Sequence, residues 1–333
     1  MVDVDHHSTG DAAAPESATQ GTSRDDEVPD RTPAAKAAQA RCLAALEASR
    51  PRPTTDEERE QIHHLQQELK QAGLVEEPHV ASWLTERCAR RYLRSHRHHY
   101  GPARDALRRS IQWRLHTRPE SAQCQACERN PRAHTYRRVG YARTGEPVIF
   151  SVFAGGEDLV PRNNVEHLMV HLEQSVGSGA RWPDRDPYPE TYIWVLHFAG
   201  YGLRHMNPAV GRACLKLFSE HYPERLRMAL IIDAPVVFRG LWLALRPFLE
   251  AQTQDRLVFM SERVSAQAFP LLFPPELCAW FAREFREVHD AGALKCKDIW
   301  SERSPARDAD RQPLEVLFPG EGKTNTEGTE QRA

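Results

Sequence analysis

Runs of β-branched and aromatic residues alternate with amphipathic helical segments in the second half of this 333-residue chain. Four such runs predict strands, at residues 148–153, 191–198, 228–232 and 257–259. Apolar residues at helical spacing predict helices between them, over 165–176 and 210–218, and a last helix over 277–288. Strands separated by helices predict an α/β domain in which at least part of the sheet is parallel.

The third predicted strand carries charges at both ends. Its apolar centre, 228–232, follows Glu224, Arg225 and Arg227 and precedes Asp233. Charges in these positions can form ion pairs that join a helix to a strand, or they can belong to a binding site at the strand's end. The residues by themselves leave both alternatives open.

The first half is predicted to be helical, because Leu84, Cys88 and Tyr92 recur at helical spacing, as do apolar residues over 103–115. Residues 81–118 hold ten arginines against two acids, which gives +8 in a chain of net charge −2. An anionic partner is therefore plausible. The arginines could also form a nucleic-acid interface, in which Tyr92, Tyr100 and Trp113 would stack on bases. A solvated helical face, or attraction to anionic membrane surfaces, explains the charge with fewer assumptions.

Several protein classes are disfavoured by the remaining pattern. No run of about 18 apolar residues predicts a membrane span, and the first residues lack the layout of a signal peptide, so we expect a cytoplasmic protein. The 7 cysteines are expected to be reduced thiols. No catalytic constellation is visible, and we expect no enzyme activity. Residues 1–37 and 291–333 have the composition of disordered tails.

Two sets of residues raise the question of a metal site. Cys124 and Cys127 form a lone CxxC without a second pair at zinc spacing, and His134 is the nearest other soft ligand. His167 and His171 have i, i+4 spacing, but no acid of an HExxH motif lies between them, so we expect surface histidines. The sequence therefore predicts no metal, with a structural zinc at the CxxC as the alternative.

The segment 238–249 is apolar on more sides than a helix that packs one face on a core. Gly240 and Pro247 weaken it towards its two ends. Such a helix could cover a hydrophobic cavity, or it could be a central helix buried on both faces.

Several ordered motifs make the chain similar to the CRAL-TRIO family, in its phosphatidylinositol/phosphatidylcholine transfer branch. The resemblance covers most of residues 65–262. The helical leader 83–107 with Trp113 and Arg114 resembles the family's "LRFLRARKFDVEKA…WR" pattern. The domain motifs are GEPVIF (145–150) for "GRPVYF", YPERL (222–226) for "YPERL", IIDAP (231–235) for "IINAP" and RPFL (246–249) for "KPFL".

The resemblance implies a helical N-terminal region, 38–118, packed on a lipid-binding domain, 119–290. That domain would have a mixed, largely parallel twisted sheet and flanking helices, with an apolar pocket closed by a gating helix. Segment 238–249 takes the place of the gating helix. Its expected contacts with acyl chains are Phe238, Leu241, Trp242, Leu245, Phe248 and Leu249.

The resemblance also implies a headgroup site for phosphatidylinositol. Glu224, Thr253 and Arg256 take the positions of the family's acid, threonine and lysine, and Pro147 also matches. An arginine keeps the positive charge and adds a planar fork suited to phosphate oxygens. The family's basic leader residue falls on His96, a weaker cation whose charge depends on pH.

Other positions depart from the family pattern. The serine and threonine of the phosphatidylcholine site fall near Tyr192 and Trp194 on the pocket strand, where aromatic rings could hold choline through cation–π contact. The usual "LP.EYGG" ending is replaced by LLFPPELCAWFAREF.

We therefore expect a monomeric, non-enzymatic carrier that exchanges phospholipid, chiefly phosphatidylinositol, at transient membrane contacts, with lipid as ligand and no cofactor. The alternative is a lipid-sensing or scaffold module without bulk transfer. An RNA-binding protein and a lipid hydrolase are further alternatives that experiments on salt dependence and on serine variants would separate.

Overall fold

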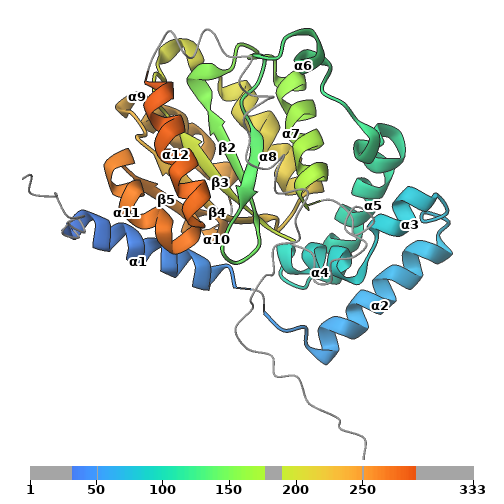
Figure 1. Cartoon of the computed structure of the whole chain (residues 1–333). Helices are drawn as coiled ribbons and strands as arrows, with labels where there is room; N and C mark the ends of the chain where they lie inside the picture. The colour runs from blue at the N-terminus through green and yellow to red at the C-terminus, as the bar shows by residue number, and fades with distance from the viewer. Residues whose placement is uncertain (1–31, 51, 177–189, 250, 290–333) are drawn as a thin grey trace, which may run out of the picture.

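A computed structural model describes residues 32–50, 52–176, 190–249 and 251–289 (Figure 1). The predicted disordered tails thus lie largely outside the described residues. The described chain forms a helical bundle beside a sheet with helices on both faces. Figure 1 shows the bundle to the right of the sheet.

The bundle contains α2 (Asp56–Gln71), α3 (Pro78–Trp83), α4 (Glu86–Ser95) and α5 (Tyr100–Thr117). Thr55 and Thr85 cap α2 and α4, because each side chain accepts a hydrogen bond from a backbone N–H of the first turn. Leu65, Tyr92 and Leu107 belong to its separate apolar core. The predicted helical character of this region is confirmed.

The sheet has five strands in the order β1-β2-β3-β4-β5. They are β1 (Arg137–Tyr141), β2 (Pro147–Val152), β3 (Tyr192–His197), β4 (Leu226–Ile232) and β5 (Leu257–Met260). The β1–β2 pair is antiparallel and the three other pairs are parallel. All four predicted strands and the mixed, largely parallel sheet are confirmed, whereas β1 was not predicted.

One face of the sheet is covered by the helices that connect the parallel strands. These are α7 (Pro161–Val176), α8 (Pro208–His221), α9 (Val236–Leu245) and the short α10 (Ala251–Asp255). Because the parallel strands follow one another in a single direction, right-handed connections all lie on the same face. Short elements η1 (Pro119–Ser121), α6 (Gln125–Arg129), η2 (Phe153–Gly155), η4 (Leu203–His205) and η5 (Arg246–Phe248) complete the described connections.

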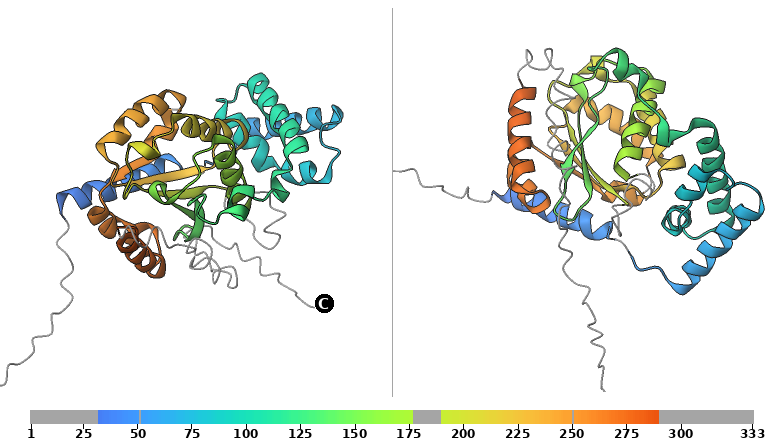
Figure 2. Two further views of the ribbon diagram at one scale, coloured as in Figure 1. Left: turned by 90° about the horizontal axis from the view of Figure 1, so that it is seen from above. Right: turned by 45° about the vertical axis from the view of Figure 1, so that its right-hand side comes forward.

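The other face packs on α1 (Pro33–Ala48), α11 (Glu262–Leu272) and α12 (Pro275–Val288). Figure 2 shows α12 and α7 on opposite sides of the sheet, and Figure 1 shows α1 running beneath it. Ala38 and Cys42 of α1 share a core with Phe150, Phe269 and strands β2–β5. Helix α1 thus begins inside the range 1–37 expected to be a tail, and it packs on the sheet rather than on the bundle.

Candidate functional site

A cavity of about 510 Å³ lies between the sheet and the helices α8 and α9. Its floor includes Tyr192, Trp194 and Leu196 of β3, with Ala229 and Ile231 of β4. These residues alternate along each strand, so their side chains project from the same face of the sheet. The two predicted pocket residues, Tyr192 and Trp194, therefore both line the cavity.

Helix α9 closes one side of this cavity. Phe238, Leu241, Trp242 and Leu245 line it, together with Leu249 beyond η5, whereas the side chain of Phe248 lies outside the described residues. The helix ends at Leu245, before Pro247, as expected from the missing N–H donor of proline.

The outer side of α9 is also apolar. Val236 is 76% exposed and Leu243 is 67% exposed. The excess of apolar residues over 238–249 therefore has a structural explanation, because one side of the helix faces the cavity while another faces outward. The alternative, a central helix buried on both faces, is wrong.

Helices α8 and α9 approach each other closely at Gly211. A Cβ atom at this position would lie 2.9 Å from Cδ1 of Leu245. A larger residue would therefore displace the Leu245 side chain, which itself lines the cavity.

Polar groups gather at the end of the cavity nearest the N-terminal ends of the parallel strands. Glu224 precedes β4 and Arg256 precedes β5, and Thr253 of α10 also lines the cavity. Arg256 donates hydrogen bonds through Nη2 to Glu224 Oε2 at 2.8 Å and through Nη1 to the carbonyl oxygen of Leu226 at 2.9 Å. The Arg256 Nε is buried without a hydrogen-bond partner among the described residues.

Glu224 has a left-handed backbone conformation, with φ of 55°. This conformation is uncommon for a residue with a side chain and costs free energy, of order 1–3 kcal/mol. The Glu224 carboxylate points to Arg256 at the cavity.

The helical bundle contributes His96 to the same cavity. His96 is the C-cap residue that follows α4, and its Nδ1 lies 2.9 Å from the carbonyl oxygen of Tyr92. Pro147, by contrast, is absent from the cavity lining, since it is buried at the start of β2 opposite Tyr141. The structure thus brings Glu224, Thr253, Arg256 and His96 to one cavity and leaves Pro147 apart.

The other charges around β4 have structural roles. Arg225 donates to the backbone carbonyl of Glu190 at 2.8 Å, and Arg227 donates to the carbonyl oxygen of Ser49. Arg227 Nε also lies 3.4 Å from Glu146 Oε1. Both alternatives left open by the sequence therefore occur, since these arginines tie segments together while Glu224 faces the cavity.

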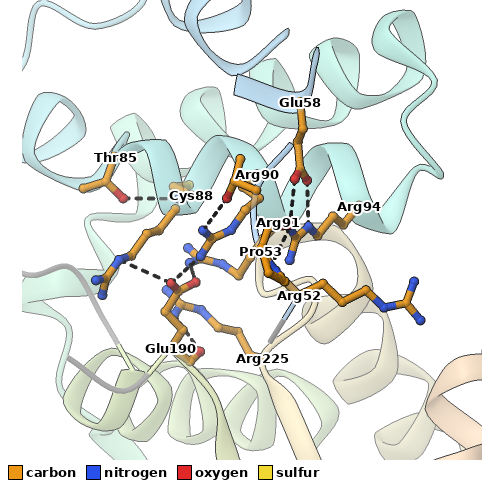
Figure 3. Close-up of polar contacts among 12 residues, drawn as sticks. Arg52, Pro53, Glu58, Thr85, Cys88, Arg90, Arg91, Arg94, Glu190 and Arg225 are labelled. Atoms are coloured by element: carbon orange, nitrogen blue, oxygen red, sulfur yellow. Dashed lines mark hydrogen bonds and ion pairs between the residues drawn. The ribbon is translucent and has the colours of Figure 1, made fainter. Parts of the chain in front are cut away.

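Much of the positive charge of 81–118 is engaged in ion pairs within the protein. Figure 3 shows Glu190 beside Arg90, Arg91 and Arg225, and Glu58 beside Arg94. Arg90 Nη2 and Arg91 Nη1 lie 2.7 Å and 3.0 Å from the Glu190 carboxylate. These Arg partners lower the pKa of Glu190 against the opposing effect of burial. The sequence total of +8 consequently overstates the charge offered to a partner.

The aromatic residues of the same segment are used in packing. Tyr92 is buried and donates to Ser110 Oγ at 2.7 Å, and Trp113 stacks on His221 with ring centroids 4.0 Å apart. Tyr100 donates to Glu68 Oε2 at 2.8 Å. These contacts give all three rings an internal role.

His167 is buried, with 5% exposure, so the expectation that it lies on the surface is wrong. His171 is partly buried. The His167 ring approaches Cys124, Cys127 and His134, and the possible ligand atoms of these four residues lie within 4.8 Å of one another. Sequence spacing did not group His167 with the CxxC, because helix α7 brings it there from 40 residues beyond Cys127.

The part of the chain that forms most of the cavity is similar to a known family of domains. Residues 139–278 match the model of the CRAL/TRIO domain. The chain has a CRAL/TRIO domain. This range contains β2–β5 and helices α7–α11, and therefore most of the cavity lining, whereas His96 lies outside it.

Two curated relatives are similar to the chain. A CRAL-TRIO domain-containing protein of Schizosaccharomyces pombe is 26% identical over 179 residues, which cover 53% of this chain and 17% of the relative. Phosphatidylinositol transfer protein sfh5 of Aspergillus oryzae is 24% identical over 254 residues, which cover 69% of this chain and 54% of the relative. The chain thus spans about half or less of each relative's length.

A solved structure of Sfh5 is 13% identical to the chain. The superposition covers 63% of this chain and 82% of that chain, with a TM-score of 0.48. Within the described part of the chain, no helix is both long enough and apolar enough to cross a membrane.

Proposed function

We propose that the chain is a non-enzymatic phospholipid-binding and transfer protein that exchanges phosphatidylinositol between membranes. The observation that carries this proposal is an apolar cavity beneath α9 with a buried arginine paired to a partly buried glutamate at one end. The apolar part would enclose acyl chains, and the polar end would hold the headgroup. The similarity to the Aspergillus relative, which is named a phosphatidylinositol transfer protein, supports this assignment.

The polar end suits a phosphorylated inositol headgroup. The Arg256 guanidinium and the Thr253 hydroxyl would donate to phosphate oxygens, and the Glu224 carboxylate would accept from inositol hydroxyls. His96 would add a weak cation from the bundle. Tyr192 and Trp194 give the floor two aromatic rings, and a choline headgroup would have to use these rings as its partners.

Helix α9 is proposed to act as the gate. Exposing acyl chains to water costs about 0.8 kcal/mol per CH₂ group, so a single phospholipid crosses water only when a protein encloses it. The exposed Val236 and Leu243 would enter the membrane interface when the gate opens. We accordingly propose a monomer that acts in the cytoplasm and binds membranes only transiently.

Native mass spectrometry of the purified protein tests lipid binding directly. We expect a protein–phospholipid complex, phosphatidylinositol in the extracted lipid, and transfer of labelled phosphatidylinositol between vesicles. Failure to bind or transfer any phospholipid would contradict the proposal. Stoichiometric binding without transfer would instead favour the lipid-sensing module.

A variant that fills the cavity makes this test specific. Ala229 lies on the cavity floor and is 3% exposed, so Ala229→Phe should occupy the space of the acyl chains and reduce bound lipid. Ala209, which is exposed on α8, provides the matched control Ala209→Phe. Equal lipid retention by the two variants would place the lipid outside this cavity.

A further inference from the structure

Four residues with soft ligand atoms converge beside the cavity from separate parts of the chain. Cys124 precedes α6 and Cys127 lies within it, whereas His134 lies in the loop before β1 and His167 lies on α7. Both histidines also line the cavity. The cluster therefore lies where α6 meets α7 and the loop before β1, and its two histidines form part of the cavity wall.

The distances within the cluster suit tetrahedral coordination. In a regular tetrahedron, zinc bonds of about 2.3 Å to sulfur and about 2.1 Å to nitrogen separate the two ligand atoms by about 3.6 Å. Nδ1 of His134 lies 3.6 Å from Sγ of Cys124 and 3.4 Å from Sγ of Cys127. Nδ1 of His167 lies 3.4 Å from the same Cys127 sulfur.

The second nitrogen of His167 orients its ring. Its Nε2 lies 2.7 Å from the carbonyl oxygen of Tyr136, an acceptor, so Nε2 must carry the proton and donate it. Nδ1 is then left with a free electron pair directed at the cluster. A backbone carbonyl bound to the outer nitrogen is the usual support of a metal-binding histidine.

The Nδ1 and Sγ atoms that face one another in the cluster have only weak partners within the described chain. Cys124, His134 and His167 are 8%, 6% and 5% exposed. His134 Nδ1 contacts the two thiol sulfurs, and its Nε2 is buried without a hydrogen-bond partner among the described residues. Sulfur is a weak donor and acceptor, so burying an imidazole against it costs free energy that a metal bond would offset.

We propose that Cys124, Cys127, His134 and His167 bind one structural zinc ion. Two thiolates neutralise the charge of Zn²⁺, and two neutral imidazoles complete four-coordination, which makes the buried cluster electrically neutral. Because the protein supplies all four ligands, no position remains for water or substrate, and the ion cross-links the cavity wall instead of catalysing a reaction. Binding would release the thiol protons.

Metal analysis of the full chain tests this site. Protein purified without chelator should contain one equivalent of zinc per chain, and a thiol-specific mercurial should release it to a metal-sensitive dye. Replacement by cobalt should give the visible absorption of a tetrahedral ion together with thiolate-to-metal charge transfer. Absence of both zinc and the cobalt spectrum after metal addition to the reduced wild-type protein would overturn the proposal.

Matched variants locate the ion. Cys127→Ser and His167→Gln should each lose most of the bound zinc, whereas Cys278→Ala, which changes a partly buried thiol in another part of the fold, should retain it. If Cys127→Ser fails to fold, the cobalt spectrum of the wild type still decides the ligand set. A Cys124–Cys127 disulfide in freshly purified protein, detected as resistance to alkylation, would also overturn the assignment.

Discussion

Arg256 Nη2 and Glu224 Oε2 lie 2.8 Å apart at the end of the cavity, although 32 residues separate them in sequence. The parallel pairing of β4 with β5 produces this proximity, because Glu224 and Arg256 precede the same ends of neighbouring strands. Arg256 is 8% exposed, so its charge is buried and depends on this partner. A phosphate group could share the guanidinium, which presents several donors in one plane.

The first prediction concerns Arg256. Arg256→Ala should reduce phosphatidylinositol transfer between vesicles at least tenfold, because the headgroup loses its main cation. Arg256→Lys, which keeps the charge but not the planar fork, should retain part of the activity. Circular dichroism should show that both variants are folded, and undiminished transfer by folded Arg256→Ala would remove Arg256 from the headgroup site.

The second prediction concerns the outer side of α9. Leu243→Asp should weaken binding to vesicles and slow transfer, because a carboxylate would enter the apolar membrane interface. The side chain is 67% exposed, so the free energy of unfolding should change little. Leu43→Asp on α1, where the leucine is 55% exposed, is the control and should bind vesicles as the wild type does. Equal vesicle binding by the two variants would exclude α9 from the membrane contact.

The third prediction concerns the ion pair between Arg114 of α5 and Glu173 of α7. Both side chains are almost fully buried, and Tyr222 also donates to Glu173 Oε1 at 2.7 Å. Glu173→Gln should lower the free energy of unfolding by about 3 kcal/mol, because the Arg114 charge would stay buried without its main partner.

Urea denaturation measures this effect, and a surface pair provides the control. Arg118→Gln breaks a contact with Glu77 in which both side chains are 50% exposed, so it should change the free energy of unfolding by less than about 1 kcal/mol. Equal effects of the two substitutions would show that burial of the Arg114–Glu173 pair does not govern its contribution.

The fourth prediction concerns stability in acid. Burial, with smaller contributions from Arg114, Lys216 and Arg109, lowers the pKa of His221 from 6.5 to about 4. Between these two pH values the unfolded chain binds a proton that the folded chain does not, so the free energy of unfolding should decrease as pH falls. Above pH 6.5 this contribution is fully present.

His221→Phe should flatten that dependence, since the ring stacked on Trp113 is kept while the titrating group is removed. Burial also lowers the pKa of His197, so part of the slope should remain. Urea denaturation at a series of pH values measures the slope, and His116→Phe at an exposed position is the control. A slope in His221→Phe as steep as in the wild type would contradict the assignment.

Local patterns were sufficient for most of the elements. The uninterrupted apolar run 228–232 predicts the buried strand β4, and the helical spacing over 165–176 predicts α7, because burial of one side of a helix imposes a period on the sequence. Strand β1 was not found, since Arg137, Arg138 and Gly140 interrupt the apolar pattern of an edge strand. The predicted helical region begins at residue 38 and so misses the start of α1, because small residues rather than large apolar ones form the buried stripe of this helix.

The site residues also divide into those that the sequence indicated and features that only the structure shows. The motif resemblance indicated Glu224, Thr253, Arg256 and His96, and the structure places all four on one cavity. It could not indicate the left-handed backbone of Glu224, the ion pairs that use the arginines of 81–118, or the approach of His167 to Cys127.

The sequence by itself determined most of the segments that become strands and helices, and that 238–249 is too apolar for one buried face. Only the tertiary structure decided which distant side chains meet, whether a charge is paired or offered to a ligand, and on which side of the sheet the cavity opens. The physical reason is that period and propensity act between near neighbours in the chain, whereas ion pairs, cavities and ligand clusters depend on how the elements pack.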